Sequence, residues 1–219
     1  IYALEDFSLT IDSNDVLHLY TGKLNLRNYQ CSSNCISVSS WSQVSSTAIE
    51  QSLKDMDSTM DMQDNVHGVY VNQSGTYYFD ESNNIAQISA HTSHTSSIVN
   101  TRVSIDAAPD GSLHVSSINH TTSSVYYSSC SSNCDSSSSW SNELVSNDTT
   151  SQAIIQVDAD GTPWILFTHN SNGATIMSRE NGQWDGQAIS AWPGAADSFG
   201  MMINSAGFVF TSLHLVSAG

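Results

Sequence analysis

Positive charge is scarce in this sequence. Its 219 residues include five Lys and Arg against 21 Asp and Glu, which gives a formal net charge of −16 and an isoelectric point near 4.4. Nucleic acids and anionic membrane surfaces are bound through basic faces, so this balance excludes both as partners. No apolar run approaches the roughly 18 residues of a membrane-spanning helix, so we expect no membrane insertion.

Helical signals are also missing. No segment combines a sustained 3.6-residue apolar period with residues that cap its two ends. Charged residues make up only 12% of the chain, so Ser, Thr, Asn and Gln must keep its surface polar. Hydrophobic residues make up 39% and occur along the whole length, which argues against disorder. The sequence begins with Ile1 rather than Met, so we expect a processed chain or a piece of a longer one.

The four cysteines form two copies of one pentapeptide, Cys31-Ser-Ser-Asn-Cys35 and Cys130-Ser-Ser-Asn-Cys134. Zinc sites more often have a two-residue gap and a second pair of ligands close by. We therefore predict two local disulfides, Cys31–Cys35 and Cys130–Cys134, and no metal. Disulfides persist in oxidising compartments, so we expect a secreted or cell-surface protein. Three glycosylation sequons agree with that location: Asn72, Asn119 and Asn147.

One sequence pattern recurs five times along the chain. Each copy joins two short apolar runs through Asp, Asn or Gly, which is typical of a β-hairpin. The Asp-Gly pairs at 110–111 and 160–161 supply the positive φ that tight hairpin turns require. Aromatic anchor residues lie at one position of each copy, 44 to 50 residues apart: His18, His67, His114, Trp164 and Phe208.

Two further strands follow each of the first four hairpins. We predict the third strands at residues 23–30, 76–79, 124–129 and 174–178. We predict that the fourth strands begin at Trp41, Ile85, Trp140 and Trp184. Four antiparallel strands in each repeat of this length predict an all-β fold, a β-propeller of about five four-stranded blades.

The predicted blades form a single domain over residues 1–219. Their approximate bounds are 7–53, 54–97, 98–149, 150–197, and 198–219 together with 1–6. The last blade is incomplete, so we expect the N-terminal segment Ile1–Asp6 to close it. A segment of a longer propeller and a strand exchanged between subunits are the alternatives, because unpaired strand edges invite association.

The repeats resemble the sialidase-like (BNR-type) propeller repeats of exported microbial proteins. The resemblance rests on an Asp-x-x-Gly-x-x-His-hydrophobic-x-Tyr run, matched at Asp12 to Tyr20, Asp64 to Tyr70, Asp106 to Ser117 and Asp158 to Phe167. It covers nearly the whole chain and implies a propeller. The sialidase Asp-box differs, because residues 158–164 hold one residue too many before the Gly and lie in another turn. The resemblance therefore implies the fold without the catalytic residues.

Two groups of residues are candidate metal ligands. His18, His67 and His114 occupy equivalent positions, and three imidazoles facing the propeller axis would bind a metal. Trp and Phe replace them in the sister repeats, so we favour a partly buried planar group whose polar edge finds a backbone partner. Carboxylates near the turns fit a weak surface calcium site, but the full ligand series is missing, so we favour turn formation. These carboxylates belong to Asp12, Asp64, Asp106, Asp158 and Asp160.

Signals of hydrolysis are absent. A glycosidase needs two carboxyl groups at a set separation, with one kept protonated, and no glutamate recurs with such a partner. A sialidase-like site would also need an arginine cluster for the substrate carboxylate. The three arginines, Arg27, Arg102 and Arg179, fall at unrelated strand positions. We therefore predict that the protein is not an enzyme and carries no cofactor.

Tryptophans are the best candidates for ligand contacts, because flat aromatic faces suit sugar rings. Trp41, Trp140 and Trp184 recur with the repeat, and the alternative is that they pack neighbouring strands together. Trp192 breaks the repeat and is the better single candidate. We predict an extracellular binding or scaffold propeller for a glycan or a protein, with self-association as a further option. The alternatives are a subunit of a filament or surface layer and a sialidase-like glycoside hydrolase.

Overall fold

The computed structural model describes residues 6–90, 103–119, 121–147, 152–169, 173–189, 196–204 and 206–215. In these ranges eighteen strands form four four-stranded antiparallel sheets and one two-stranded sheet. The only helical segments described are two short 3-10 turns, η1 (Val38–Ser40) and η2 (Ser137–Ser139). None of the described helical segments is long and apolar enough to cross a membrane.

Within every sheet the strands are ordered as they occur along the chain. The first sheet contains β1 (Asp6–Ile11), β2 (Leu17–Gly22), β3 (Asn25–Cys31) and β4 (Ser42–Ala48). The second contains β5 (Asp55–Met60), β6 (Val66–Asn72), β7 (Gly75–Asp80) and β8 (Ile85–Ser89). The third contains β9 (Ser104–Ala107), β10 (Leu113–Asn119), β11 (Ser124–Cys130) and β12 (Ser141–Ser146). The fourth contains β13 (Ala153–Val157), β14 (Pro163–His169), β15 (Gly173–Glu180) and β16 (Gln183–Ile189), and the fifth β17 (Ala196–Ile203) and β18 (Val209–Leu215).

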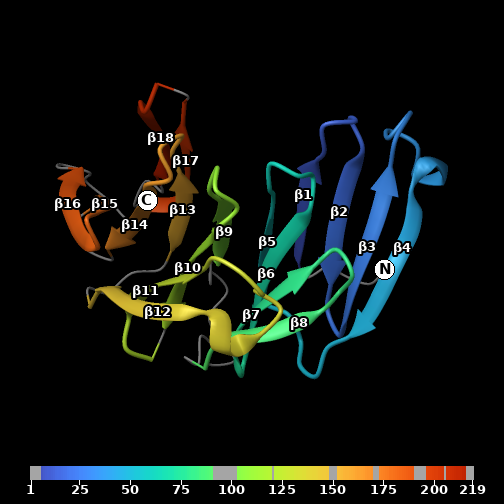
Figure 1. Cartoon of the computed structure of the whole chain (residues 1–219), viewed down its shortest axis with the longest axis horizontal. Helices are drawn as coiled ribbons and strands as arrows, with labels where there is room; N and C mark the ends of the chain where they lie inside the picture. The colour runs from blue at the N-terminus through green and yellow to red at the C-terminus, as the bar shows by residue number, and fades with distance from the viewer. Residues whose placement is uncertain are drawn as a thin grey trace.

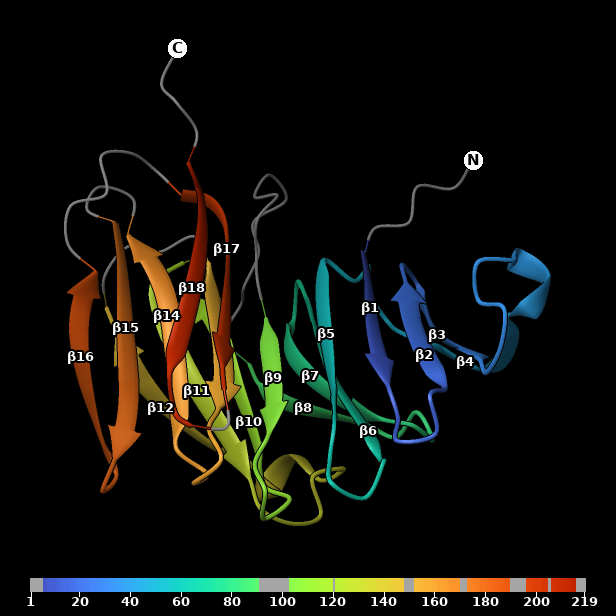
Figure 2. The same ribbon diagram turned by 90° about the horizontal axis from the view of Figure 1, so that it is seen from above.

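The five sheets follow one another around an arc, from the first sheet at the right of Figure 1 to the fourth at the left. The first strand of each sheet lies beside the first strand of the next: β1 beside β5, β5 beside β9, β9 beside β13 and β13 beside β17. Figure 2 shows the same succession from above. Up-and-down sheets arranged in this way are the blades of a β-propeller, so the predicted fold is confirmed.

The two ends of the chain complete this picture. The fifth sheet has two described strands, β17 and β18, which agrees with an incomplete last blade. Residues 1–5 of the expected closing segment lie outside the described residues. Asp6, which we expected in that closing strand, instead begins β1, where it pairs with Gly22.

One side chain builds the hairpin between the first two strands of a sheet. In the first sheet, Asp12 Oδ1 accepts the main-chain N–H groups of Asn14 at 2.9 Å and Val16 at 2.8 Å. In each hairpin, the residue three positions after the one equivalent to Asp12 adopts a positive φ of 63° to 85°, which Gly, Asp and Asn tolerate best. Four hairpins close with such a cap, from Asp12, Asp61, Asp158 and Asn204.

The third hairpin lacks this cap, and the strand pairing corrects the predicted alignment of the repeats. We placed Asp64 and Asp106 at the position of Asp12, but the strand pairing puts Asp61 and Ala108 there. Because Ala108 has no carboxylate, Asp110 Oδ1 accepts the N–H of Ser112 instead. The sequence pattern misplaced these acids because Asp occurs at several positions around each turn.

Apolar side chains fill each junction between consecutive sheets. At the first junction, Tyr20 and Leu26 of the first sheet pack against Val66 and Phe79 of the second. The second junction joins residues of β6, β7 and β8 to residues of β9, β10 and β11, and the third joins the third sheet to the fourth. The second and third sheets therefore bury one face against the preceding sheet and the other against the following sheet, and this burial supplies most of the stability.

Acidic residues on the innermost strands also tie the sheets together. Asp57 Oδ2 accepts the main-chain N–H of Ile105 at 3.1 Å, and Asp106 Oδ2 accepts that of Val157 at 2.7 Å. Burial between the sheets raises the pKa of both Asp57 and Asp106, although these hydrogen bonds oppose the shift. These acids therefore set the register of one sheet against the next.

Candidate functional site

Two of the three repeated histidines contact the carboxylate that caps their own hairpin. His18 Nε2 lies 3.3 Å from Asp12 Oδ2, and His67 Nε2 lies 3.2 Å from Asp61 Oδ2. In the fourth sheet, Trp164 Nε1 donates to Asp158 Oδ2 at 2.9 Å. In these three sheets the ring therefore meets a carboxylate rather than the backbone partner that we expected, and in the third sheet His114 Nε2 lies 2.9 Å from the hydroxyl of Ser112 instead.

The strand pairing changes one member of this series. His18 pairs with Thr10 and Phe210 pairs with Met202, so Phe210, and not Phe208, holds the histidine position in the fifth sheet. Phe208 N–H instead donates to Asn204, as Val16 N–H donates to Asp12. The histidines lie in three separate sheets, and the described residues contain no group of three His, Cys, Asp or Glu that could hold a metal ion.

The three repeated tryptophans hold neighbouring segments together. Trp41 Nε1 donates to the carbonyl of Cys35 at 3.0 Å, and Trp140 Nε1 donates to that of Cys134 at 2.8 Å. Trp140 is buried, with its ring centroid 5.5 Å from that of Tyr78 in the second sheet. Trp184 packs edge-on against Tyr127 of the third sheet at 5.2 Å. The packing role that we weighed against ligand binding thus accounts for Trp140 and Trp184.

One candidate for a ligand contact lies outside the described residues. This residue is Trp192, the best single candidate for an exposed contact.

The three sequons differ in exposure. Asn72 and Asn119 are buried, and their side-chain oxygens accept main-chain N–H groups two residues further on. Asn147 is exposed, which an N-linked glycan requires. Asn147 is therefore the sequon that the fold leaves accessible.

The acids considered for calcium do not converge. Asp12 and Asp158 cap separate hairpins, and Asp106 bonds to the neighbouring sheet. Asp64 accepts hydrogen bonds from the main chain and the hydroxyl of Ser13, which ties the second hairpin to the first. Asp160 N–H donates to Asp158, and its own side chain is exposed.

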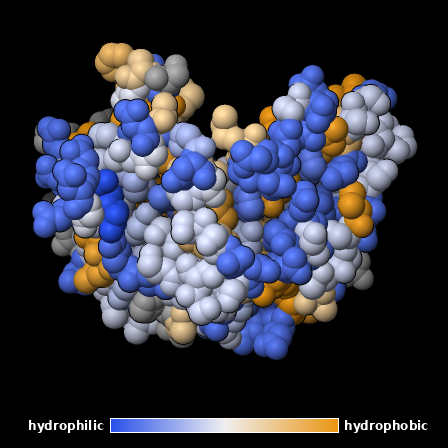
Figure 3. All heavy atoms as spheres, viewed as in Figure 1, coloured by the Kyte–Doolittle hydropathy of each residue, from blue (hydrophilic) through white to orange (hydrophobic). Residues whose placement is uncertain are grey.

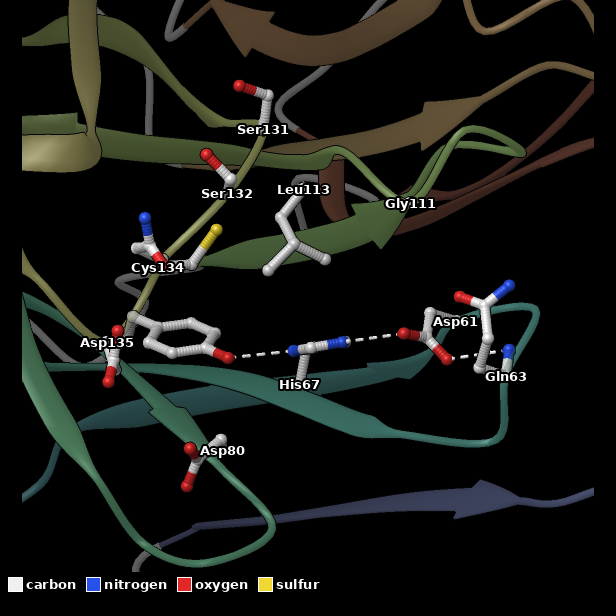
Figure 4. A pocket seen from close by; sticks show the side chains of 12 residues that line it. Asp61, Gln63, His67, Asp80, Gly111, Leu113, Ser131, Ser132, Cys134 and Asp135 are labelled. Carbon is white, nitrogen blue, oxygen red and sulfur yellow. Dashed lines mark hydrogen bonds and ion pairs between the residues drawn. The ribbon is translucent and has the colours of Figure 1, made fainter.

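A pocket of about 280 Å³ opens between the second and third sheets (Figure 4). Asp61, His67, Tyr78 and Asp80 of the second sheet form one wall. The opposite wall consists of Gly111, Leu113 and the disulfide loop at 131–135. Both predicted disulfides, Cys31–Cys35 and Cys130–Cys134, are present, and the second fixes this wall.

Hydrogen bonds orient the polar groups of the pocket. His67 Nδ1 lies 2.8 Å from the Tyr78 hydroxyl, and its other ring nitrogen faces Asp61 (Figure 4). Burial opposes ionisation of Asp61, but bonds from Asn65 and His67 outweigh it and hold the pKa of Asp61 below its usual value. Burial and the nearby Asp80 and Asp135 raise the pKa of Tyr78. Asp61 therefore stays a carboxylate and Tyr78 a neutral phenol over the ordinary pH range.

The equivalent place between the third and fourth sheets is filled. There Arg179 Nε donates to Glu143 Oε1 at 2.6 Å, and its guanidinium carbon lies 5.6 Å from the ring centroid of Tyr127. Trp184 Nε1 donates to the same Glu143 oxygen at 2.6 Å. The fold brings Arg179 to Glu143, 36 residues away in the chain. No local motif signals this pair, because its members belong to different sheets.

No family model matches the chain, and no curated protein matches it. Solved structures do match. A variant of AofleA from Arthrobotrys oligospora is 12% identical over 99% of this chain and 67% of that chain, with a TM-score of 0.64. The Aleuria aurantia lectin in complex with Fucα1-6GlcNAc is 13% identical over 91% of this chain and 67% of that one, with a TM-score of 0.59. Kuenenia stuttgartiensis hydrazine synthase is 9% identical over 95% of this chain, with a TM-score of 0.60.

This likeness concerns the fold. At such identities the neighbours show that the chain shares the β-propeller architecture, while the closer resemblance to sialidase-type repeats stays a prediction. The chain spans 61% of the length of the hydrazine synthase chain and 67% of the other two.

Proposed function

We propose that this protein is a non-catalytic, extracellular glycan-binding propeller whose ligand site is the pocket between the second and third sheets. The observation that supports this role is the pocket itself, a concave site between two rigid sheets, lined by carboxylate, amide and hydroxyl groups. Ligand sites in proteins are concave and carry a few precisely placed polar groups.

The chemistry of the lining suits a sugar. Sugar hydroxyls donate hydrogen bonds, and the carboxylates of Asp61, Asp80 and Asp135 accept them. Asp61 and Asp80 are already held by turn bonds, so little side-chain freedom is lost when a ligand binds. Gln63, Asn133 and Asp135 are exposed at the pocket, where they meet a ligand first.

The surroundings favour binding without turnover. A glycosidase needs one carboxyl held protonated beside an ionised one. In this pocket, hydrogen bonds lower the pKa of Asp61, and both oxygens of Asp80 accept bonds from Asn84. The alternative, a glycoside hydrolase, predicts cleavage of aryl-glycoside substrates.

Two further findings support the proposal. Two loop-closing disulfides suit an oxidising, extracellular compartment. The fold is shared with the Aleuria aurantia lectin, whose structure contains the disaccharide Fucα1-6GlcNAc. The proposal does not carry that sugar over, because only the fold is common.

A glycan array tests the role, and two variants test the site. Asp135→Ala removes an exposed carboxylate from the pocket. We expect affinity for any glycan that binds to fall about tenfold or more, since a hydrogen bond to a charged group contributes about 1.5–3 kcal/mol. Asp185→Ala, which removes an exposed carboxylate of β16 outside the pocket, is the matched control and should bind normally. The proposal fails if no glycan binds, or if both variants bind like the native protein.

A further inference from the structure

The first sheet exposes an apolar face that its sister sheets bury. Phe7, Leu9 and Ile11 of β1 are 61%, 50% and 54% exposed. Strand pairing places Val103 and Ile105 of the third sheet at the positions of Phe7 and Leu9, and they are only 4% and 3% exposed. The same residue positions are therefore core in one sheet and surface in another.

The buried sister positions show what this face is built to contact. Val103 and Ile105 pack against Val69 and Val71 of the preceding, second sheet. In the fourth sheet, Ala153 and Ile155 hold these positions and are fully buried against the third sheet. In both of these junctions, this face of a sheet is thus covered by the sheet before it.

A contact between a tyrosine and a tryptophan also recurs between consecutive sheets. Trp140 of the third sheet packs on Tyr78 of the second, and Trp184 of the fourth packs on Tyr127 of the third. Tyr78 and Tyr127 hold the same position of the third strand, where the first sheet has Asn28. The second sheet, which follows Asn28, contains no Trp. In the second, third and fourth sheets, tryptophan therefore occurs at the position of Trp140 and Trp184 only where the preceding sheet has a tyrosine at the position of Tyr78 and Tyr127.

We propose that the outer face of the first sheet, formed by Phe7, Leu9, Ile11 and Trp41, is a docking surface for one further four-stranded sheet of this same repeat. That partner sheet carries a tyrosine at the position of Tyr78 and Tyr127, and the tyrosine packs on Trp41. The inference concerns assembly of the propeller and does not depend on the ligand pocket.

A single repeat sheet fits this surface better than a second copy of the chain. In Figure 1 the first and fifth sheets stand on either side of the open side of the arc, and Figure 3 shows a notch between these ends. A second copy, five sheets wide, would have to enter this notch. Its net charge of −16 would also repel the first copy.

Thiol labelling tests the proposal. The native cysteines are all disulfide-bonded, so Leu9→Cys introduces a single thiol on the docking surface. In one form of the protein, a copy of residues 54–101 precedes Asp6, with the spacing that joins the second sheet to the third. We expect this added sheet to slow labelling of Leu9→Cys about tenfold or more, because thiol reactivity follows exposure.

Two controls make the outcome decisive. Met62→Cys lies in an exposed hairpin and should label at the same rate with or without the added sheet, provided that the protein is folded. The substitution Val69→Asp in the added copy places a charge in the contact with the first sheet. That copy should not dock, so rapid labelling of Leu9→Cys should return. Unchanged labelling in the presence of the intact added sheet overturns the proposal. So does protection that increases with protein concentration alone, which would assign the face to a second copy.

Discussion

The junction between the second and third sheets and the junction between the third and fourth use one frame. In each, a histidine Nδ1 faces a tyrosine hydroxyl, His67 with Tyr78 and His114 with Tyr127. A tryptophan of the following sheet then packs on that tyrosine. One junction nevertheless leaves a pocket, while an arginine fills the other.

Two substitutions account for the difference. Arg179 holds the strand position that Cys130 holds in the third sheet, and Glu143 holds that of Ala86 in the second. Where the sequence has Arg and Glu, an ion pair covers the tyrosine face. Where it has a disulfide loop and Ala, the loop stands away and walls a pocket. A conserved packing frame can therefore be closed or opened without altering the fold.

The largest effect should come from the tryptophans of the two junctions. Trp140→Ala should lower the free energy of unfolding by about 3–5 kcal/mol, since Trp140 is buried and its removal leaves a cavity. Trp184→Ala should cost less, because Trp184 is only half-buried. Urea denaturation of both variants measures the difference. Equal losses would mean that the two tryptophans contribute equally to the free energy of unfolding, although one junction contains a pocket and the other an ion pair.

The stability of the protein should depend on pH through His114, which lies at the junction between the third and fourth sheets. Burial, with a smaller contribution from Arg179, lowers the pKa of His114 from 6.5 to about 4, against the opposing effect of Asp110. Between these values the unfolded chain binds a proton that the folded one does not. Stability is therefore complete above pH 6.5 and falls with pH through this window, by about 3 kcal/mol at most.

Urea denaturation at pH 7 and pH 4.5 measures this contribution. We expect His114→Gln, which removes the titrating ring, to lose less stability than the native protein between these two values. The acids with lowered pKa, such as Asp61 and Glu143, are present in both proteins and should affect both alike. An equally steep loss in the variant contradicts a buried neutral His114.

Features that depend on neighbours in the sequence were predictable. The hairpins follow from turn residues such as the Asp-Gly pairs, and Gly111 and Gly161 adopt the expected positive φ. The disulfides join cysteines four residues apart, so they follow from spacing alone. The repeat then fixes the fold, because each copy can bury its faces only against neighbouring copies.

Features that depend on contacts between sheets were not predictable. The pocket exists because the disulfide loop of one sheet faces Tyr78 of another, and no local pattern records that distance. The Glu143–Arg179 pair was not predicted for the same reason. Phe208 was mistaken for the histidine-equivalent residue because two phenylalanines follow this turn. The Asn204 cap shows that Phe208 corresponds to Val16 and Phe210 to His18.

The two disulfide loops allow a matched comparison. Replacing both cysteines of either pair with serine should cost about 2 kcal/mol in the chain-entropy model, because each loop is equally short. Only the loss of Cys130–Cys134 should weaken glycan binding, since that loop alone walls the pocket between the second and third sheets. Thermal denaturation and glycan affinity measure the two effects separately. Similar binding by both variants would remove the loop at 131–135 from the site.

The ion pair that fills the other junction should contribute least. Arg179 and Glu143 are about one-third exposed, so water screens their attraction, and we expect a coupling energy of about 1 kcal/mol. A double-mutant cycle of Arg179→Ala and Glu143→Ala isolates this coupling from the loss of packing over Tyr127. Glu143→Ala also removes the acceptor of Trp184, so its single loss should exceed that of a simple surface acid. Because the pair is partly exposed, the coupling should shrink in high salt. A coupling of zero would mean that Arg179 fills the junction through its aliphatic stem and the face of Tyr127 alone, and that charge has no part in closing it.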